Sequence, residues 1–374
     1  MSREDSANGG SRLAEMPIFT TRRLIQTLVI VLLLLGGIYF LFPKLVGLGD
    51  SLSRLRQAEA IWIAVAVGFN VLAYATYIAL FKAVVGGDVL RLRWSETYEI
   101  NLAGVAATRL FSAGGAGGIA LTYWALRKAG LPRRDSARRM IAFVSLQYAF
   151  YPLAIIVFGI LLRTGVLNGK SSVELTIIPA AIAGLLLIVG ILITLIPPDL
   201  ERRLTHFAHS DRSRQWVRTA AKVPATLGEG FRFAFSLFAH PSKGGLAVVG
   251  AAGYWAANIG ILWASFHAFG VHVPLGVVVQ GFFLGMVANL FPFAPAGVGA
   301  VDAGMIGAFV LFGIPQETVF PAILVFRLVS FWMPIPPGIF AFFQLRHTVH
   351  RWEQEELPIE RGGRAGSDLE PAVR

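Results

Sequence analysis

Apolar residues run in long stretches along most of the chain, with few of the polar interruptions that a soluble domain needs. A membrane-spanning helix takes roughly 20 mostly apolar residues. We therefore expect an all-α, polytopic integral membrane protein with about six full spans. They are predicted at residues 25–45, 60–82, 140–162, 176–196, 244–268 and 318–345.

Two further apolar regions, 97–126 and 276–312, are each broken in the middle by glycine and proline. The first break runs from Ser112 to Gly118 and the second from Pro292 to Gly299. Such residues stop a helix, and unpaired backbone is tolerated at membrane depth only inside protein or beside water. Each half is short for a full crossing, so we favour two re-entrant helical hairpins. The alternative is a loop between two short spans.

Basic residues cluster before the first span, between 127 and 139, between 197 and 243, and after the last span. Cytoplasmic loops carry such an excess of Lys and Arg. We therefore predict a multi-pass protein of the plasma (inner) membrane with both termini cytoplasmic. A cytoplasmic tail (1–23) would precede a transmembrane domain (24–346), and a disordered cytoplasmic tail (347–374) would follow it. The aromatic and basic segment 197–243 resembles a helix lying at the membrane interface.

With this topology, residues 60–162 and 244–345 each contain a span, a broken region and a second span, in opposite orientations. A short sequence echo accompanies this symmetry: Gly130-Leu131-Pro132 follows the first break as Gly313-Ile314-Pro315 follows the second. Inverted repeats whose broken helices meet near the midplane are a recurrent plan for moving a substrate across a membrane. We therefore predict an inverted-topology repeat.

The composition of the chain excludes several classes of partner and functional site. The net charge of +11 could suit nucleic acid, but no basic stretch adjoins a foldable soluble domain, so we expect no nucleic-acid partner. The absence of cysteine excludes disulfides, thiolate metal sites and cysteine nucleophiles. No nucleotide or zinc motif is present. We therefore assign no catalytic residue, metal or cofactor, and favour a transporter over an enzyme without deciding between them.

Charged residues within apolar segments are the sharpest functional signal, because a charge at the bilayer centre is costly unless it is paired or hydrated. Arg109, Asp302 and Arg327 are the three candidates. The arginines suit lipid phosphate, whereas the alternative is an internal ion pair that only holds the repeats together. Together with residues of the breaks, the predicted substrate-binding set is Arg109, Ser112, Gly114, Gly117, Asn289, Pro295, Gly297, Gly299, Asp302 and Arg327.

The second break and the residues after it carry a family resemblance. Residues 295–304, then Gly313-Ile314-Pro315, Arg327-Leu328 and Trp332-Met333-Pro334, resemble the lysylphosphatidylglycerol synthase transmembrane region family. The likeness covers roughly residues 20–345 and implies a flippase-like domain without the soluble aminoacyl-transfer domain. Two positions depart from the family: Asp302 stands where members usually carry Glu, and Ile119 and Ala120 stand where many carry an acidic residue.

These observations favour translocation of a phospholipid or polyprenyl-linked lipid between leaflets. The alternative is a membrane-embedded glycosyl- or headgroup transferase, or its accessory subunit, in cell-envelope biosynthesis. A scaffold of an envelope complex is a third interpretation. The expected partners are membrane lipids with anionic headgroups and a lipid-modifying enzyme. No pattern in the sequence indicates an oligomeric state.

Overall fold

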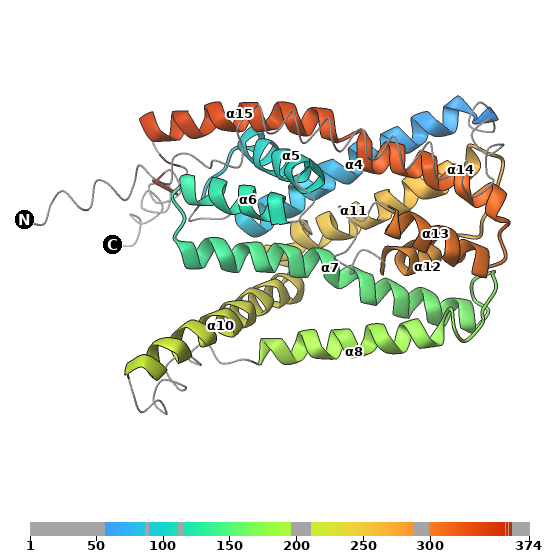
Figure 1. Ribbon diagram of the computed structural model, residues 1–374, viewed down its shortest axis with the longest axis horizontal. Helices are drawn as coiled ribbons and strands as arrows, with labels where there is room; N and C mark the ends of the chain where they lie inside the picture. The colour runs from blue at the N-terminus through green and yellow to red at the C-terminus, as the bar shows by residue number, and fades with distance from the viewer. Residues whose placement is uncertain are drawn as a thin grey trace, which may run out of the picture.

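The computed structural model describes residues 57–86, 90–110, 116–195, 211–287 and 299–355, together with 357, 359 and 360. Within these residues the regular structure is entirely helical (Figure 1), which confirms the predicted all-α class. The predicted span at 25–45 lies outside the described residues. So do the central parts of both breaks, 111–115 and 288–298.

In the described part of the chain, five helices are long and apolar enough to cross a membrane. They match five of the predicted spans. The first four are α4 (Ala60–Val85), α7 (Arg133–Arg163), α8 (Ile177–Thr194) and α11 (Pro241–His267). The fifth is the continuous stretch Gln316–Gln354, which contains α14 (Gln316–Arg327), η5 (Leu328–Trp332) and α15 (Ile335–Gln354).

Each broken region forms a pair of short helices. The first pair is α5 (Trp94–Leu110) and α6 (Ala116–Lys128), and the second is α12 (Leu275–Met286) and α13 (Ala300–Leu311). At 1.5 Å per residue, none of these helices reaches the roughly 30 Å of a hydrocarbon core. The two pairs lie toward opposite ends of the bundle's long axis (Figure 1). This arrangement supports the re-entrant interpretation, with one hairpin entering from each side.

Small residues allow the two arms of each hairpin to pack closely. A Cβ on Gly118 of α6 would lie 2.4 Å from the Gly104 carbonyl oxygen of α5. A Cβ on Gly285 of α12 would lie 2.7 Å from the Met305 nitrogen of α13. Real Cβ atoms essentially never approach this closely. Both hairpins therefore depend on a glycine at the contact between their arms.

The turns that follow the two hairpins have the same hydrogen bonds. Gly130 (φ 99°) and Gly313 (φ 92°) both adopt the left-handed conformation that glycine favours. The next residue, Leu131 or Ile314, donates its N–H to the carbonyl five residues before it, at 3.1 Å in each turn. A proline then precedes α7 and α14. The sequence echo thus corresponds to one repeated local structure, which supports the predicted inverted repeat.

Two apolar cores accompany the two halves. One forms around the first hairpin and α15 and includes Leu80, Leu126 and Leu345. The other forms around the second hairpin and α14 and includes Phe282, Phe309 and Val325. Between the halves, α4 and α11 pack tightly, with Gly250 against Leu80. The junction of the halves is therefore a close contact between helices in corresponding positions of the two predicted repeats.

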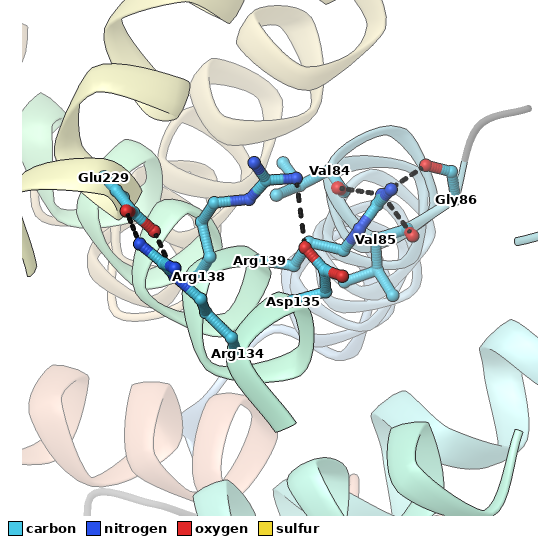
Figure 2. A network of polar contacts seen from close by, with 8 residues as sticks. All are labelled: Val84, Val85, Gly86, Arg134, Asp135, Arg138, Arg139 and Glu229. Carbon is cyan, nitrogen blue, oxygen red and sulfur yellow. Dashed lines mark hydrogen bonds and ion pairs between the residues drawn. The ribbon is translucent and has the colours of Figure 1, made fainter. Parts of the chain in front are cut away.

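The basic segment after α6 is more ordered than a loop. We placed the start of the third span near residue 140, but α7 begins at Arg133, and Arg139 is buried at 8% exposure. Figure 2 shows its guanidinium at the end of α4, where Nη1 donates to the carbonyls of Val84, Val85 and Gly86. These carbonyls lack helical partners at a helix C-terminus, and a cation there also meets the negative end of the helix dipole.

Segment 197–243 contains a long helix, α10 (Asp211–Ala239), that packs on α7 and α8. Glu229 accepts hydrogen bonds from Arg134 of α7 (Figure 2), and Arg232 Nη1 donates to the Thr194 carbonyl at the end of α8. Phe235 and Phe238, near the C-terminal end of the helix, are exposed. This mixture of exposed aromatic and basic residues is what an interfacial helix requires, and that location remains a prediction.

We predicted a disordered tail from residue 347, but the last helix continues beyond that residue. α15 ends at Gln354, and Trp352 is buried, with its indole N–H donating to Glu96 of α5 across 3.1 Å. Docking against α5 therefore keeps this segment helical.

Candidate functional site

The long helix after the second hairpin is interrupted between α14 and α15. Leu328–Trp332 form a turn of π-helix, in which Met333 N–H donates to the Leu328 carbonyl across 3.1 Å. Pro334 has no N–H, so it cannot donate to the Ser330 carbonyl four residues earlier. The interruption therefore leaves acceptors without their usual helical donors, and π-turns inside α-helices are frequent at functional sites.

Arg109, in the last turn of α5, supplies a donor to the Ser330 carbonyl and binds two neighbouring acceptors. Its Nη2 donates to the Ser330 carbonyl across 2.9 Å and to the Tyr74 hydroxyl of α4 across 2.5 Å, and Nη1 donates to the Phe331 carbonyl. The end of the first hairpin's first arm is thereby fixed to the break in the second half. All three partners are neutral, so the positive charge of Arg109 is solvated by dipoles rather than cancelled by these contacts.

Asp302 and Arg327 form an ion pair at the second hairpin. Asp302 Oδ1 lies 2.5 Å from Arg327 Nε, and the Arg327 residue is 7% exposed. Asp302 Oδ2 accepts the N–H of Gly299, which precedes the first turn of α13, across 3.0 Å. A carboxylate in this position also meets the positive end of the helix dipole. Asp302 therefore stabilises the start of α13 and the charge of Arg327 together.

The two arginines lie beside the same aromatic ring. The guanidinium carbon of Arg109 is 5.0 Å from the Phe331 ring centroid, and that of Arg327 is 5.4 Å from it. An aromatic face attracts cations at such distances. With Asp302, these groups comprise two positive charges and one negative charge, a net charge of +1. The arrangement places a positive site where elements of both halves meet.

The structure thus brings three of the predicted residues together: Arg109, Asp302 and Arg327 all converge on the segment around Phe331. Gly299 begins α13 beside Asp302, and Gly117 is half-buried in the first turn of α6. Ser112, Gly114, Asn289, Pro295 and Gly297 lie outside the described residues.

Sequence reasoning missed Tyr74, Phe331 and the freed Ser330 carbonyl. Pro334 was a usable signal, because a proline inside a long apolar helix implies an acceptor that another group must satisfy. Two buried amide side chains of the hairpins differ in their partners. Gln280 Nε2 donates to the Leu175 carbonyl across 3.0 Å, whereas the buried Asn101 side chain has no partner in the described part of the chain.

The fold and these contacts define a polytopic helical membrane protein in which two broken helical regions contribute charged groups to one buried site. The chain matches the model of the lysylphosphatidylglycerol synthase TM region over residues 18–338. It belongs to that family, and the resemblance carried by the second break is confirmed.

Two relatives from Methanothermobacter thermautotrophicus, each called a UPF0104 membrane protein, match shorter stretches. One is 34% identical over 87 residues, which is 23% of this chain and 26% of the relative. The other is 36% identical over 72 residues, which is 19% of this chain and 22% of the relative. The matched part therefore spans about a quarter of the length of these relatives. Together with the family match, they support a lipid-related role in a membrane.

Proposed function

We propose that this protein translocates a lipid with an anionic headgroup, a phospholipid or a polyprenyl-linked lipid, between the leaflets of the plasma (inner) membrane. The observation that carries the proposal is the net positive site around Phe331, where Arg109 of one half meets Arg327 of the other. Charge at this depth is costly, and a phosphate would compensate it. In this proposal both termini lie in the cytoplasm, and a lipid-modifying enzyme acts on the lipid that is moved.

Arg109 is the residue best suited to release its present contacts for a headgroup. Its acceptors are two carbonyl oxygens and a phenol, and a phosphate oxygen would be a stronger acceptor because it is ionised. Arg327, by contrast, already has a carboxylate partner. We therefore assign the first contact with the headgroup to Arg109, and the support of the second hairpin to the Asp302–Arg327 pair.

The test reconstitutes the purified full chain into liposomes that carry a fluorescent phosphatidylglycerol in both leaflets, followed by an impermeant quencher. With wild type, the fluorescence should fall well below the plateau at which the inner-leaflet half of the lipid is protected from the quencher. Arg109→Gln should slow this phase by about tenfold to a hundredfold, because a hydrogen bond to a charged group contributes roughly 1.5–3 kcal/mol. Arg134→Gln is the matched control, since Arg134 is exposed and pairs with Glu229 at the end of the bundle.

A plateau equal to that of protein-free liposomes, with anionic, zwitterionic and polyprenyl lipids alike, would contradict the proposal. Equal rates for Arg109→Gln and wild type would contradict the role of Arg109. Size-exclusion profiles of both variants establish that each is folded before the rates are compared.

A further inference from the structure

Two buried carboxylates lie on α5, away from the site around Phe331 and outside the five spanning helices. Glu96 is 3% exposed and Glu99 is 7% exposed. Both are within the part of α5 that docks against the end of α15. Buried carboxylates are rare unless they are paired or hydrogen-bonded, so the partners of each oxygen indicate what the residue can do.

The two carboxylates differ in their donors. Glu96 has one for each oxygen: Arg93 N–H donates to Oε2 across 2.7 Å, and the Trp352 indole N–H donates to Oε1 across 3.1 Å. Glu99 interacts with the Thr348 hydroxyl, but its Oε2 is buried without a partner among the described residues. An unsatisfied buried acceptor is unfavourable, and more so when it carries charge. Both carboxylate oxygens of Glu96 therefore have a hydrogen-bond donor, whereas one oxygen of Glu99 has none among the described residues.

The charged groups packed around Glu99 compensate it only in part. From α15, Arg351 acts on it, and Arg351 Nη2 also donates to Thr348 Oγ1 across 2.9 Å. Lys82 of α4 donates instead to the Leu92 carbonyl. The basic residues of α6 are engaged elsewhere, Arg127 with the Leu131 carbonyl and Lys128 with Glu353. The other titratable groups nearby on α15, Arg346, His347 and His350, are exposed.

The balance of these effects raises the pKa of Glu99 above that of an exposed carboxyl. Burial raises the pKa of the Glu99 carboxyl, and Glu96 adds to the rise, while Thr348 and Arg351 oppose it. Protonation would remove a buried charge that lacks a second donor. A single carboxyl that is accessible in one state and buried in another is a common means of proton coupling in membrane proteins.

We propose that Glu99 is a proton-binding site whose occupancy is coupled to lipid movement, which links transport to a proton gradient. This inference rests on the proposed function. Its physical basis is the position of Glu99 between two helices that both reach the site: α5 carries Glu99 near its start and Arg109 in its last turn, about 15 Å farther along. α15 faces Glu99 and follows directly from the η5 break that Arg109 holds.

Proton binding is measured first, without reference to transport. The carboxylic C=O stretch of the full chain in liposomes is followed by infrared spectroscopy while the pH is lowered. A carboxylic band that appears at higher pH than those of the exposed carboxyls should be present in wild type and in Glu96→Gln, and should be missing in Glu99→Gln. Thr348→Val should shift the midpoint to higher pH, because the lost hydrogen bond favours the ionised form. This variant keeps the test decisive if Glu99→Gln fails to fold. A wild-type band that neither Glu99→Gln nor Thr348→Val changes would overturn the proposal.

Coupling is measured next, with the fluorescent phosphatidylglycerol liposomes under an imposed pH gradient. Wild type and Glu96→Gln should move lipid at least fivefold faster with the gradient in one direction than in the other. Glu99→Gln should still move lipid but lose this asymmetry. Lipid movement in wild type that ignores the gradient would overturn the coupling and leave the proposed function intact. A wild type that moves no lipid would overturn the proposed function, and the infrared titration would still decide the proton site.

Discussion

The two hairpins have the same arrangement of helices, but their charged residues bind different kinds of partner. In the first, Arg109 precedes the break and binds neutral acceptors of the second half and of α4. In the second, Asp302 follows the break and binds Arg327 in an ion pair. Arg109 of the first hairpin therefore has no carboxylate partner among the described residues, whereas Asp302 of the second hairpin forms an ion pair with Arg327.

The long helices after the hairpins show the same contrast. Both contain a proline, Pro152 within α7 and Pro334 after η5. A side chain from another helix donates to a carbonyl just before each proline. In the first half the donor is the neutral indole of Trp255, which reaches the Gln147 carbonyl at 2.7 Å, and in the second half it is Arg109. The side-chain donor one turn or so before the proline is thus a neutral indole in one half and a cation in the other.

Removing Asp302 should have the largest effect. Asp302→Ala leaves Arg327 buried beside Phe331 without its carboxylate, and breaking a buried pair in this way costs about 3–5 kcal/mol. The variant should show a strongly lowered unfolding midpoint in detergent, by circular dichroism. Asp302→Ala combined with Arg327→Met should recover most of the loss, because the charge that Asp302 balanced is then also removed.

Arg109→Met provides the comparison, since its partners are neutral and their loss leaves no opposite charge unpaired. Its unfolding midpoint should fall less than that of Asp302→Ala. An equal or larger fall for Arg109→Met would break the distinction between an exchangeable charge and a structural pair.

How far the sequence predicts this arrangement depends on the range of each interaction. Span length and composition are local, so five helices could be placed, but α7 begins seven residues before the predicted span and α15 ends nine residues after it. The rule against unpaired membrane charge singled out Arg109, Asp302 and Arg327. The acceptors of Arg109 could not be predicted, because Ser330 lies 221 residues away and its carbonyl is free only in the folded break. The burial of Glu99 likewise depends on the docking of α15.

Replacing the glycine at the contact between the two arms should destabilise both hairpins. This tests whether the two hairpins pack in the same way. Gly118→Ala would force a Cβ to 2.4 Å from the Gly104 carbonyl oxygen, and Gly285→Ala would force one to 2.7 Å from the Met305 nitrogen. Overpacking of this kind costs about 1–3 kcal/mol. Both should lower the unfolding midpoint. Gly307→Ala on α13 is the matched control, because nothing lies within 4 Å of its Cβ position. A loss at only one hairpin would show that their packing is not equivalent.

The smallest effect is expected at the turns after the hairpins. Gly130→Ala and Gly313→Ala each place a side chain at positive φ, which costs about 1–2 kcal/mol. Gly130 has a second constraint, since its Cβ would lie 2.4 Å from a methyl carbon of Ile359, whereas the Gly313 position is open. Gly130→Ala should therefore lower the unfolding midpoint slightly more. Adding Ile359→Ala should bring it level with Gly313→Ala, because the backbone strain of the two turns is the same. If the Gly130→Ala, Ile359→Ala variant still had a lower unfolding midpoint than Gly313→Ala, the two turns would differ in more than the contact with Ile359.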